Sequence, residues 1–142
     1  RNILLNADSF QEAKEMLEMT TIASDCLILL SGIEKEEMVV IERTPTRYAT
    51  REAETKYITV TNDYKKLENN TKEESVLQST SCSRFNRTQE LLERKIPTDI
   101  EKCFEILKDK NVMMGITVQQ MVFDNKTGEI ELIKTGGNKE LW

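Results

Sequence analysis

The residues best suited to chemistry lie between positions 57 and 87 and include an amide, two guanidinium groups and a thiol. Asn62 directly follows the run Tyr57–Thr61, whose β-branched and aromatic residues are typical of a strand. An amide held at a strand end can donate to a developing negative charge without titrating. Asparagine also commonly caps a strand and opens a turn, so both interpretations of Asn62 stay open.

Arg84 and Arg87 are three residues apart in a segment with a helical pattern, so they share one helix face. Guanidinium groups offer a rigid fork of donors that can hold a carboxylate or orient a nucleophile. They could equally be solvated residues that pair with Glu90 and Glu93. A long polar loop precedes this helix and is long enough to bring Asn62 and Arg84 together. The sequence therefore predicts a polar cluster at the rim of a sheet.

The three cysteines divide into one candidate for reactivity and two candidates for the core. Cys82 lies at the expected helix start beside an arginine, a setting that can lower a thiol pKa, although it could also be a small structural residue. Cys26 and Cys103 fall in apolar stripes typical of a core. Their odd number and wide spacing favour neither a metal site nor a disulfide framework, so we expect a reducing cytoplasm.

Composition excludes several functional classes. Histidine is absent, which removes the Ser-His and Cys-His dyads and nearly all zinc catalysis. The 25 acidic and 20 basic residues are interspersed, with a net charge of -5, so nucleic acid is not expected as a partner. No apolar run approaches the ~20 residues of a membrane span. We predict no metal and no cofactor.

The first half of the chain predicts a helix followed by four strands. Ser9 with Glu12 forms a capping box that begins a helix over about residues 10–19. The apolar run 26–30 predicts a central strand buried on both faces. Returning strands are expected at 38–41, at 46–51 and at 57–61, and the short connections between these four strands imply antiparallel pairing.

The second half predicts two helices and a hairpin. A helical pattern runs from about residue 81 to the Ile96-Pro97 pair, and Thr98 with Glu101 forms a second capping box before another helix. Strands are expected at 116–123 and 130–133, joined by a turn at 124–128. The pattern indicates an α+β fold with helices packed on antiparallel sheet, and 142 residues suit a single domain, 1–142.

The order of these segments resembles the C-terminal half of N-terminal-nucleophile (Ntn) cysteine amidases and acyltransferases, the group of acid ceramidase, the penicillin acyltransferases and, more remotely, the choloylglycine (bile salt) hydrolases. The resemblance covers nearly the whole chain. Its best motifs are the Thr61-Asn62 pair and the stretch from Ser81 to Arg87. The other matching pieces are the opening Arg1-Asn2-Ile3-Leu4, the helix around Glu12-Ala13 and the strand end Val39-Val40-Ile41-Glu42-Arg43.

The resemblance implies a four-layer αββα sandwich of which this chain supplies a part. In such enzymes a cysteine freed at a new N-terminus by self-cleavage attacks an amide, and its own α-amine serves as the base, so no histidine is needed. Asn62 matches the asparagine that helps to form the site around the nucleophile and the oxyanion. Arg84 matches the site arginine, and Arg87 is the second choice.

The chain departs from that group because none of its cysteines stands at an N-terminus. We therefore expect a C-terminal fragment of a longer protein, inactive alone, whose partners are the missing N-terminal half and a small amide or acyl substrate. A half-sandwich should expose apolar surface, so self-association is expected too. Two alternatives stay open: a freestanding binding module whose polar cluster grips a small anion, and a thiol enzyme that uses Cys82.

Overall fold

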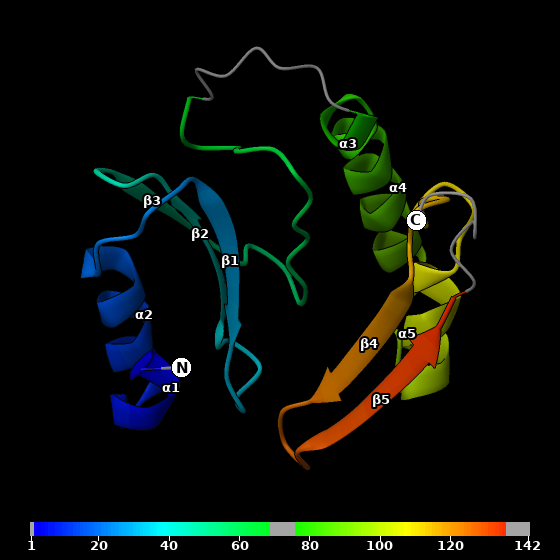
Figure 1. The fold of residues 1–142 in the computed structure, drawn as a ribbon. Coiled ribbons are helices and arrows are strands. Elements are labelled where there is room, and N and C mark those ends of the chain that lie inside the picture. The colour runs from blue at the N-terminus through cyan, green and yellow to red at the C-terminus, as the bar shows by residue number, and fades with distance from the viewer. Residues whose placement is uncertain (1, 69–75, 136–142) are drawn as a thin grey trace. The chain divides into compact units, whose positions relative to one another are not determined.

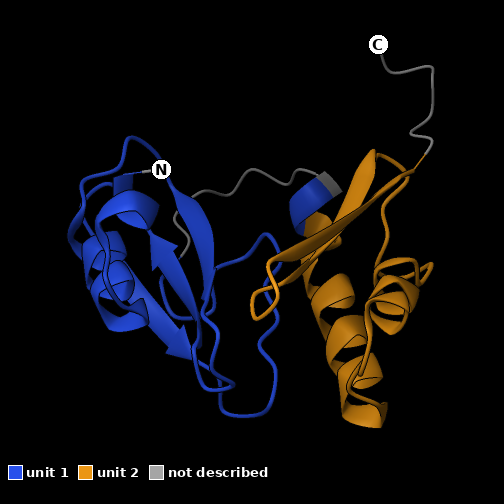
Figure 2. Ribbon diagram, turned by 90° about the horizontal axis from the view of Figure 1, so that it is seen from below, with its two compact units in different colours: residues 1–78 blue, residues 79–142 orange. Residues whose placement is uncertain are grey.

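A computed structural model describes residues 2–68 and 76–135 of the chain (Figure 1). Its backbone contacts divide it into two compact units, residues 1–78 and 79–142, shown in blue and orange in Figure 2. Within the described ranges, no helix combines the length and apolarity that are needed to cross a bilayer. The prediction of a single domain that belongs to a longer chain stays a prediction.

Unit 1 is built from two helices and a three-stranded antiparallel sheet of order β1-β2-β3. The elements are α1 (Asn2–Asn6), α2 (Phe10–Met19), β1 (Cys26–Ser31), β2 (Met38–Arg43) and β3 (Tyr48–Glu52). The predicted cap of α2 is confirmed, since the Ser9 hydroxyl accepts from the Glu12 amide at 3.1 Å. The Glu12 carboxylate reaches back to the Asp8 amide at 2.8 Å, one residue earlier than in a standard capping box.

The central strand is β2, and the expectation that residues 26–30 form it is wrong. Val40 and Ile41 are fully buried and Val39 is 4% exposed, whereas Leu29 on β1 is 50% exposed. Both strands carry equally apolar runs, so hydrophobicity alone does not distinguish the edge from the centre. Strand β2 is the buried one because it has a neighbouring strand on each side and because other parts of the chain cover both of its faces.

The register of the sheet assigns its two faces. Residues 39, 41 and 43 share the face that α2 covers, where the Thr50 hydroxyl donates to Glu18 at 2.5 Å and Lys14 pairs with Glu52 at 3.0 Å. Glu42 and Arg51 lie on the opposite face, which is covered by the segment 57–67. Figure 1 shows α2 on one side of the sheet and this segment, drawn in green, on the other.

The predicted fourth strand, Tyr57–Thr61, is wrong, because these residues form an irregular segment that joins neither sheet of the described structure. Their β-branched side chains still lie against the protein, and Thr59 is 6% exposed. The carbonyl of Thr59 accepts from the Arg51 side chain instead of from a neighbouring strand. Strand propensity thus identified a half-buried segment but not its hydrogen bonding.

Unit 2 contains α4 (Ser81–Arg94), α5 (Ile100–Leu107) and a hairpin of β4 (Gln119–Asp124) and β5 (Glu129–Lys134), and a short helix, α3 (Val76–Ser79), precedes α4. The second capping box is corrected by one residue. Asp99 rather than Thr98 caps α5, accepting from the Lys102 amide at 2.9 Å. Residues 116–118 lie outside β4, so that strand is shorter than expected.

The hairpin turn forms as predicted. The Asp124 carboxylate accepts from the amides of Lys126 and Thr127, and Gly128 adopts a φ of 77° that favours glycine. One face of the hairpin packs toward α5, where the Gln120 side chain donates to the Leu107 carbonyl at 2.5 Å. The mixture of helices and antiparallel strands confirms the α+β class.

Candidate functional site

Asn62 lies in the irregular segment of unit 1, and its side chain is exposed. Three residues before it, the Thr59 carbonyl accepts from Arg51 Nη2 at 3.0 Å. Two residues after it, the Tyr64 hydroxyl donates to the backbone carbonyl of Arg43. The chain is therefore fixed to the sheet on both sides of Asn62, and the side-chain amide of Asn62 lies on the short segment between these two points.

The Glu42 carboxylate anchors the part of the segment that follows Asn62. Its Oε1 accepts from the Lys65 amide at 2.7 Å and from Arg51 Nε at 3.2 Å. Its Oε2 accepts from the amides of Lys66 and Leu67, each at 2.8 Å. The side chain has no exposed surface, so a full set of charged and backbone donors replaces water around it.

Sequence reasoning missed the role of Glu42 and of its neighbour Arg43. A signal is present, because a Glu-Arg pair continues the apolar run Val39-Val40-Ile41 without a break. Alternation along a strand places two such charges on opposite faces, and both faces of β2 are covered. A charge in the middle of a buried strand needs partners, and the identity of those partners cannot be derived from local sequence.

The Tyr64 phenol lies close to several acidic groups. Burial raises its pKa above the usual value, and the negative charges of Asp25 and, more weakly, Glu42 act in the same direction. The phenol therefore stays protonated at neutral pH and keeps its hydrogen bond to the carbonyl of Arg43. Tyr64 acts here as a fixed donor that ties the segment to the end of β2.

Arg84 lies in the first turn of α4 and is half-buried. Its backbone amide donates to the Thr80 carbonyl at 3.0 Å, and its Nε donates to the Thr80 hydroxyl at 3.3 Å. The guanidinium is thus tied to the start of its own helix. Such a placement restricts where its donors can point, which suits a group that has to meet a substrate or a nucleophile.

Arg87 makes two ion pairs within unit 2. Its Nη2 lies 2.6 Å from Asp109 Oδ2, beyond the end of α5, and its Nη1 lies 2.8 Å from Glu90 on its own helix. The guanidinium lowers the pKa of both carboxyl groups, and they in turn raise the pKa of Arg87. The predicted pairing with Glu90 is confirmed, and the link to Asp109 joins α4 to the turn after α5.

The predicted site residues fall in different units, Asn62 in unit 1 and Arg84 and Arg87 in unit 2. Within its own unit each has the setting described above. Their predicted convergence at one rim stays a prediction.

All three cysteines lie in the described ranges, and none of them forms a disulfide there. Cys82 is exposed as the second residue of α4. Cys103 is half-buried in α5, where burial first and Asp99 second raise its pKa, so this thiol is less reactive than usual. Cys26 is half-buried as well, so neither of the two predicted core cysteines is fully enclosed. In the described ranges no three thiols or carboxylates gather closely enough to hold a metal ion.

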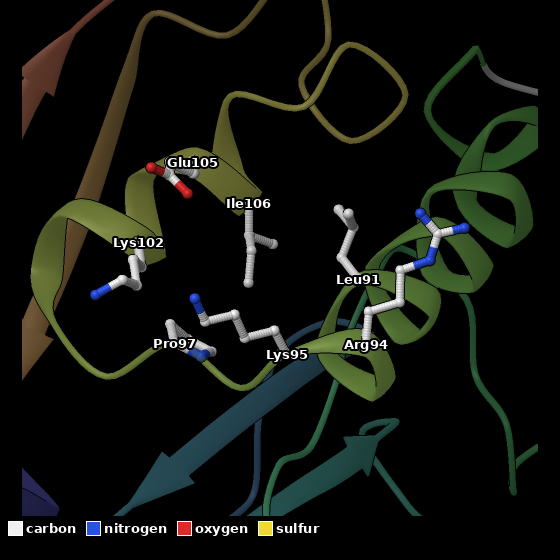
Figure 3. Close-up of a pocket in the computed structure, with 7 residues that line it drawn as sticks. All are labelled: Leu91, Arg94, Lys95, Pro97, Lys102, Glu105 and Ile106. Atoms are coloured by element: carbon white, nitrogen blue, oxygen red, sulfur yellow. The ribbon is translucent and has the colours of Figure 1, made fainter.

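A pocket of about 210 Å³ lies between α4 and α5 (Figure 3). Leu91 and Ile106 point into the space between the two helices and form an apolar floor. The pocket is lined by Leu91, Arg94, Lys95, Pro97, Lys102, Glu105 and Ile106. Two of its three cations already have carboxylate partners, since Arg94 pairs with Glu90 and Lys102 with Asp99. Its attraction for an anion therefore depends mainly on Lys95.

Comparison with known families finds a match that covers almost the whole chain. The model of the family described as acyl-coenzyme A:6-aminopenicillanic acid acyl-transferase matches residues 1–133. A comparison with curated proteins finds no match.

Proposed function

The chain belongs to the acyl-coenzyme A:6-aminopenicillanic acid acyl-transferase family, whose fold is of the Ntn type. We therefore propose that it is part of an enzyme that breaks or forms linear amide bonds. The family supports an acyltransferase or hydrolase-like function. The match over residues 1–133 is the observation that carries the proposal. Cleavage of a carbon–nitrogen amide bond is the finer reading, and it rests on the resemblance to cysteine amidases.

In the proposed mechanism, the nucleophile is a cysteine at the start of a segment that precedes Arg1. Its α-amine takes the thiol proton, and the sulfur attacks the amide carbonyl. The α-ammonium group then returns the proton to the amide nitrogen, so that the C–N bond breaks, the amine leaves and a thioester remains. Water then releases the acid, or a second amine takes up the acyl group. This chemistry needs no histidine from residues 1–142, because the base is the nucleophile's own α-amine.

Asn62 and Arg84 have separate roles in this mechanism. The exposed amide of Asn62 donates to the oxyanion that develops on the substrate carbonyl, on a segment that is fixed at both ends. Arg84 orients the nucleophile or a substrate carboxylate through its fork of donors. Arg87 is the weaker candidate, because two carboxylates already occupy its guanidinium.

The outer face of the β4–β5 hairpin supports the proposal of a missing partner segment. Phe123, Ile130 and Leu132 are 57%, 58% and 45% exposed, and the register places all three on one face. In the proposed full-length sandwich, the upstream segment that carries the cysteine covers such apolar surface. Without that segment, pairing between copies of this chain covers it instead. We also propose a cytoplasmic location, where cysteines that form no disulfide among the described residues are usual.

Substitutions in the full-length protein test the role of Asn62. With chromogenic acyl amides as substrates, Asn62→Ala lowers kcat by about 10²–10³-fold, as for loss of one oxyanion donor. Asn111→Ala is the matched control, since Asn111 is an exposed asparagine in the turn after α5. Equal activity of the two variants would show that Asn62 does not stabilise the transition state.

Arg84→Lys tests the second residue and keeps the charge but removes the fork. We expect lower kcat/KM, whereas Arg47→Lys, in the exposed turn between β2 and β3, leaves kcat/KM unchanged. Unchanged kcat/KM in Arg84→Lys would remove Arg84 from the site.

The proposal also predicts that residues 1–142 alone hydrolyse no acyl amide. Turnover by this chain that survives Cys82→Ser would contradict the need for an upstream nucleophile. Turnover that is abolished by Cys82→Ser would instead identify a thiol enzyme that uses Cys82.

A second candidate function, a small-anion binding module, is favoured by the pocket between α4 and α5. Lys95 lines that pocket beside an apolar floor. Titration with a short-chain carboxylate, followed by amide NMR, tests this function. Shifts at residues 91–106 that disappear in Lys95→Gln would support it, and no shifts at millimolar carboxylate would reject it.

A further inference from the structure

The contacts of Glu42 raise the question of why a fully buried charge lies in the central strand. A carboxylate without water is stabilised only when its oxygens accept several hydrogen bonds. Glu42 accepts three from consecutive backbone amides and one from Arg51, at 2.7–3.2 Å. An apolar residue at this position would pack on the sheet at lower cost, but it would provide nothing to hold the amides of residues 65–67.

Arg51 extends this hold to the other side of Asn62. Its Nε donates to Glu42, and its Nη2 donates to the carbonyl of Thr59. Glu42 and Arg51 belong to neighbouring strands and lie on the face away from α2. The ion pair of the buried Glu42 and the half-buried Arg51 therefore holds the segment at residue 59 and again at residues 65–67, and the exposed Asn62 lies between these two points.

We infer that Glu42 is a positioning residue that acts through Arg51 and the amides of residues 65–67 to hold Asn62 in place for the reaction. This inference rests on the proposed role of Asn62. The segment joins neither sheet of the described residues, and the side-chain contacts of Glu42 and Arg51 fix it at residue 59 and at residues 65–67. A donor has to be held within a fraction of an ångström to stabilise a transition state, and a displacement of about 1 Å can cost about 10²-fold in rate.

The main test is Glu42→Gln in the full-length protein. Glutamine keeps the size of the side chain, but its amide group turns donors toward the amides of Lys66 or Lys65. Hydrogen exchange of the amides of residues 65–67 should become at least about 10-fold faster. The kcat for acyl amides should fall by about 10–100-fold, with little change in KM. Glu52→Gln is the matched control, because Glu52 ends β3 with an exposed ion pair to Lys14 and should change neither quantity.

A second variant covers the case in which Glu42→Gln does not fold. Arg51→Lys keeps a cation beside Glu42 but cannot reach both Glu42 and the Thr59 carbonyl with a rigid fork. It should speed exchange across residues 60–64 and lower kcat in the same way. Thermal unfolding of each variant is measured so that kcat is compared well below the melting temperature.

The outcomes separate this inference from the proposed function. Faster exchange together with lower kcat supports the positioning role. Faster exchange with unchanged kcat overturns it, provided that Asn62→Ala is impaired, and unchanged exchange in both variants overturns it as well. If Asn62→Ala is fully active, the proposed function of Asn62 fails and the positioning role fails with it, whereas the exchange data still report whether Glu42 holds the segment.

Discussion

Replacing Arg43 by methionine tests how a buried guanidinium holds α2 on the sheet. The side chain is 3% exposed. It donates from Nη1 to the Leu17 carbonyl and from Nη2 to the Thr20 carbonyl, the latter at 2.6 Å. Both carbonyls lie at the C-terminal end of α2, where a helix leaves its carbonyls unpaired and favours positive charge.

The expected loss of stability follows from these contacts. Two hydrogen bonds from a charged donor contribute about 1.5–3 kcal/mol each. Against this, Arg43 Nε is buried and has no hydrogen-bond partner among the residues that the structure describes, a cost of about 1–3 kcal/mol that methionine removes. Thr20 is exposed, so its carbonyl regains water. The free energy of unfolding should therefore fall by about 2 kcal/mol.

Urea unfolding, followed by circular dichroism, measures this change. Arg47→Met is the matched control, since Arg47 is exposed in the turn between β2 and β3 and its loss should change stability by less than about 0.5 kcal/mol. Equal unfolding midpoints for the two variants, or a more stable Arg43→Met protein, would refute the reasoning.

Three further predictions concern single side chains. Because Arg87 lowers the pKa of Asp109, the stability from this pair is present above about pH 3.9 and is lost as the pH falls through the pKa of Asp109 in the folded protein. In Arg87→Gln, carboxyl NMR titration should show that the pKa of Asp109 rises toward about 3.9. An unchanged pKa of Asp109 would exclude the ion pair. Because burial raises the pKa of Tyr64, the contribution of Tyr64 to stability is present below about pH 10 and is lost as the pH rises further. Tyr64→Phe should remove the last phase of the phenolate absorbance titration. Survival of that phase would assign it to another tyrosine. The hydroxyl of Thr59 is buried with no hydrogen-bond partner in the described ranges. Thr59→Val should therefore raise the free energy of unfolding in urea by about 1 kcal/mol. A lower free energy of unfolding would reveal a hydrogen bond to that hydroxyl.

Local patterns predicted the elements of the fold well where a short stretch determines them. Ser9 caps α2, and Asp124 and Gly128 form the hairpin turn, because each depends on bonds to residues a few positions away. At the start of α5, Thr98 and Asp99 are both good caps in sequence. The carboxylate of Asp99 has the advantage that it also pairs with the Lys102 side chain.

Long-range contacts limited the rest of the prediction. The local sequences of β1 and β2 do not predict which of the two strands lies at the centre of the sheet, with a neighbouring strand on each side. The run Tyr57–Thr61 has the composition of a strand, but the carbonyl of Thr59 accepts from a side chain of β3 and not from a neighbouring strand. Glu42 meets its amide partners more than twenty residues later, at a distance that no local motif encodes. For the site, resemblance indicated Asn62, and the structure revealed the contacts that hold it.

The apolar outer face of the β4–β5 hairpin has a practical consequence for work with the isolated chain. A preparation of these 142 residues should adsorb to hydrophobic resins and precipitate as its concentration rises. The reason is that Phe123, Ile130 and Leu132 form an exposed hydrophobic stripe that can associate with other copies of the chain. A lysine in place of Ile130 would break the stripe at a site far from the segment that carries Asn62 in sequence, and would give a soluble version for spectroscopy.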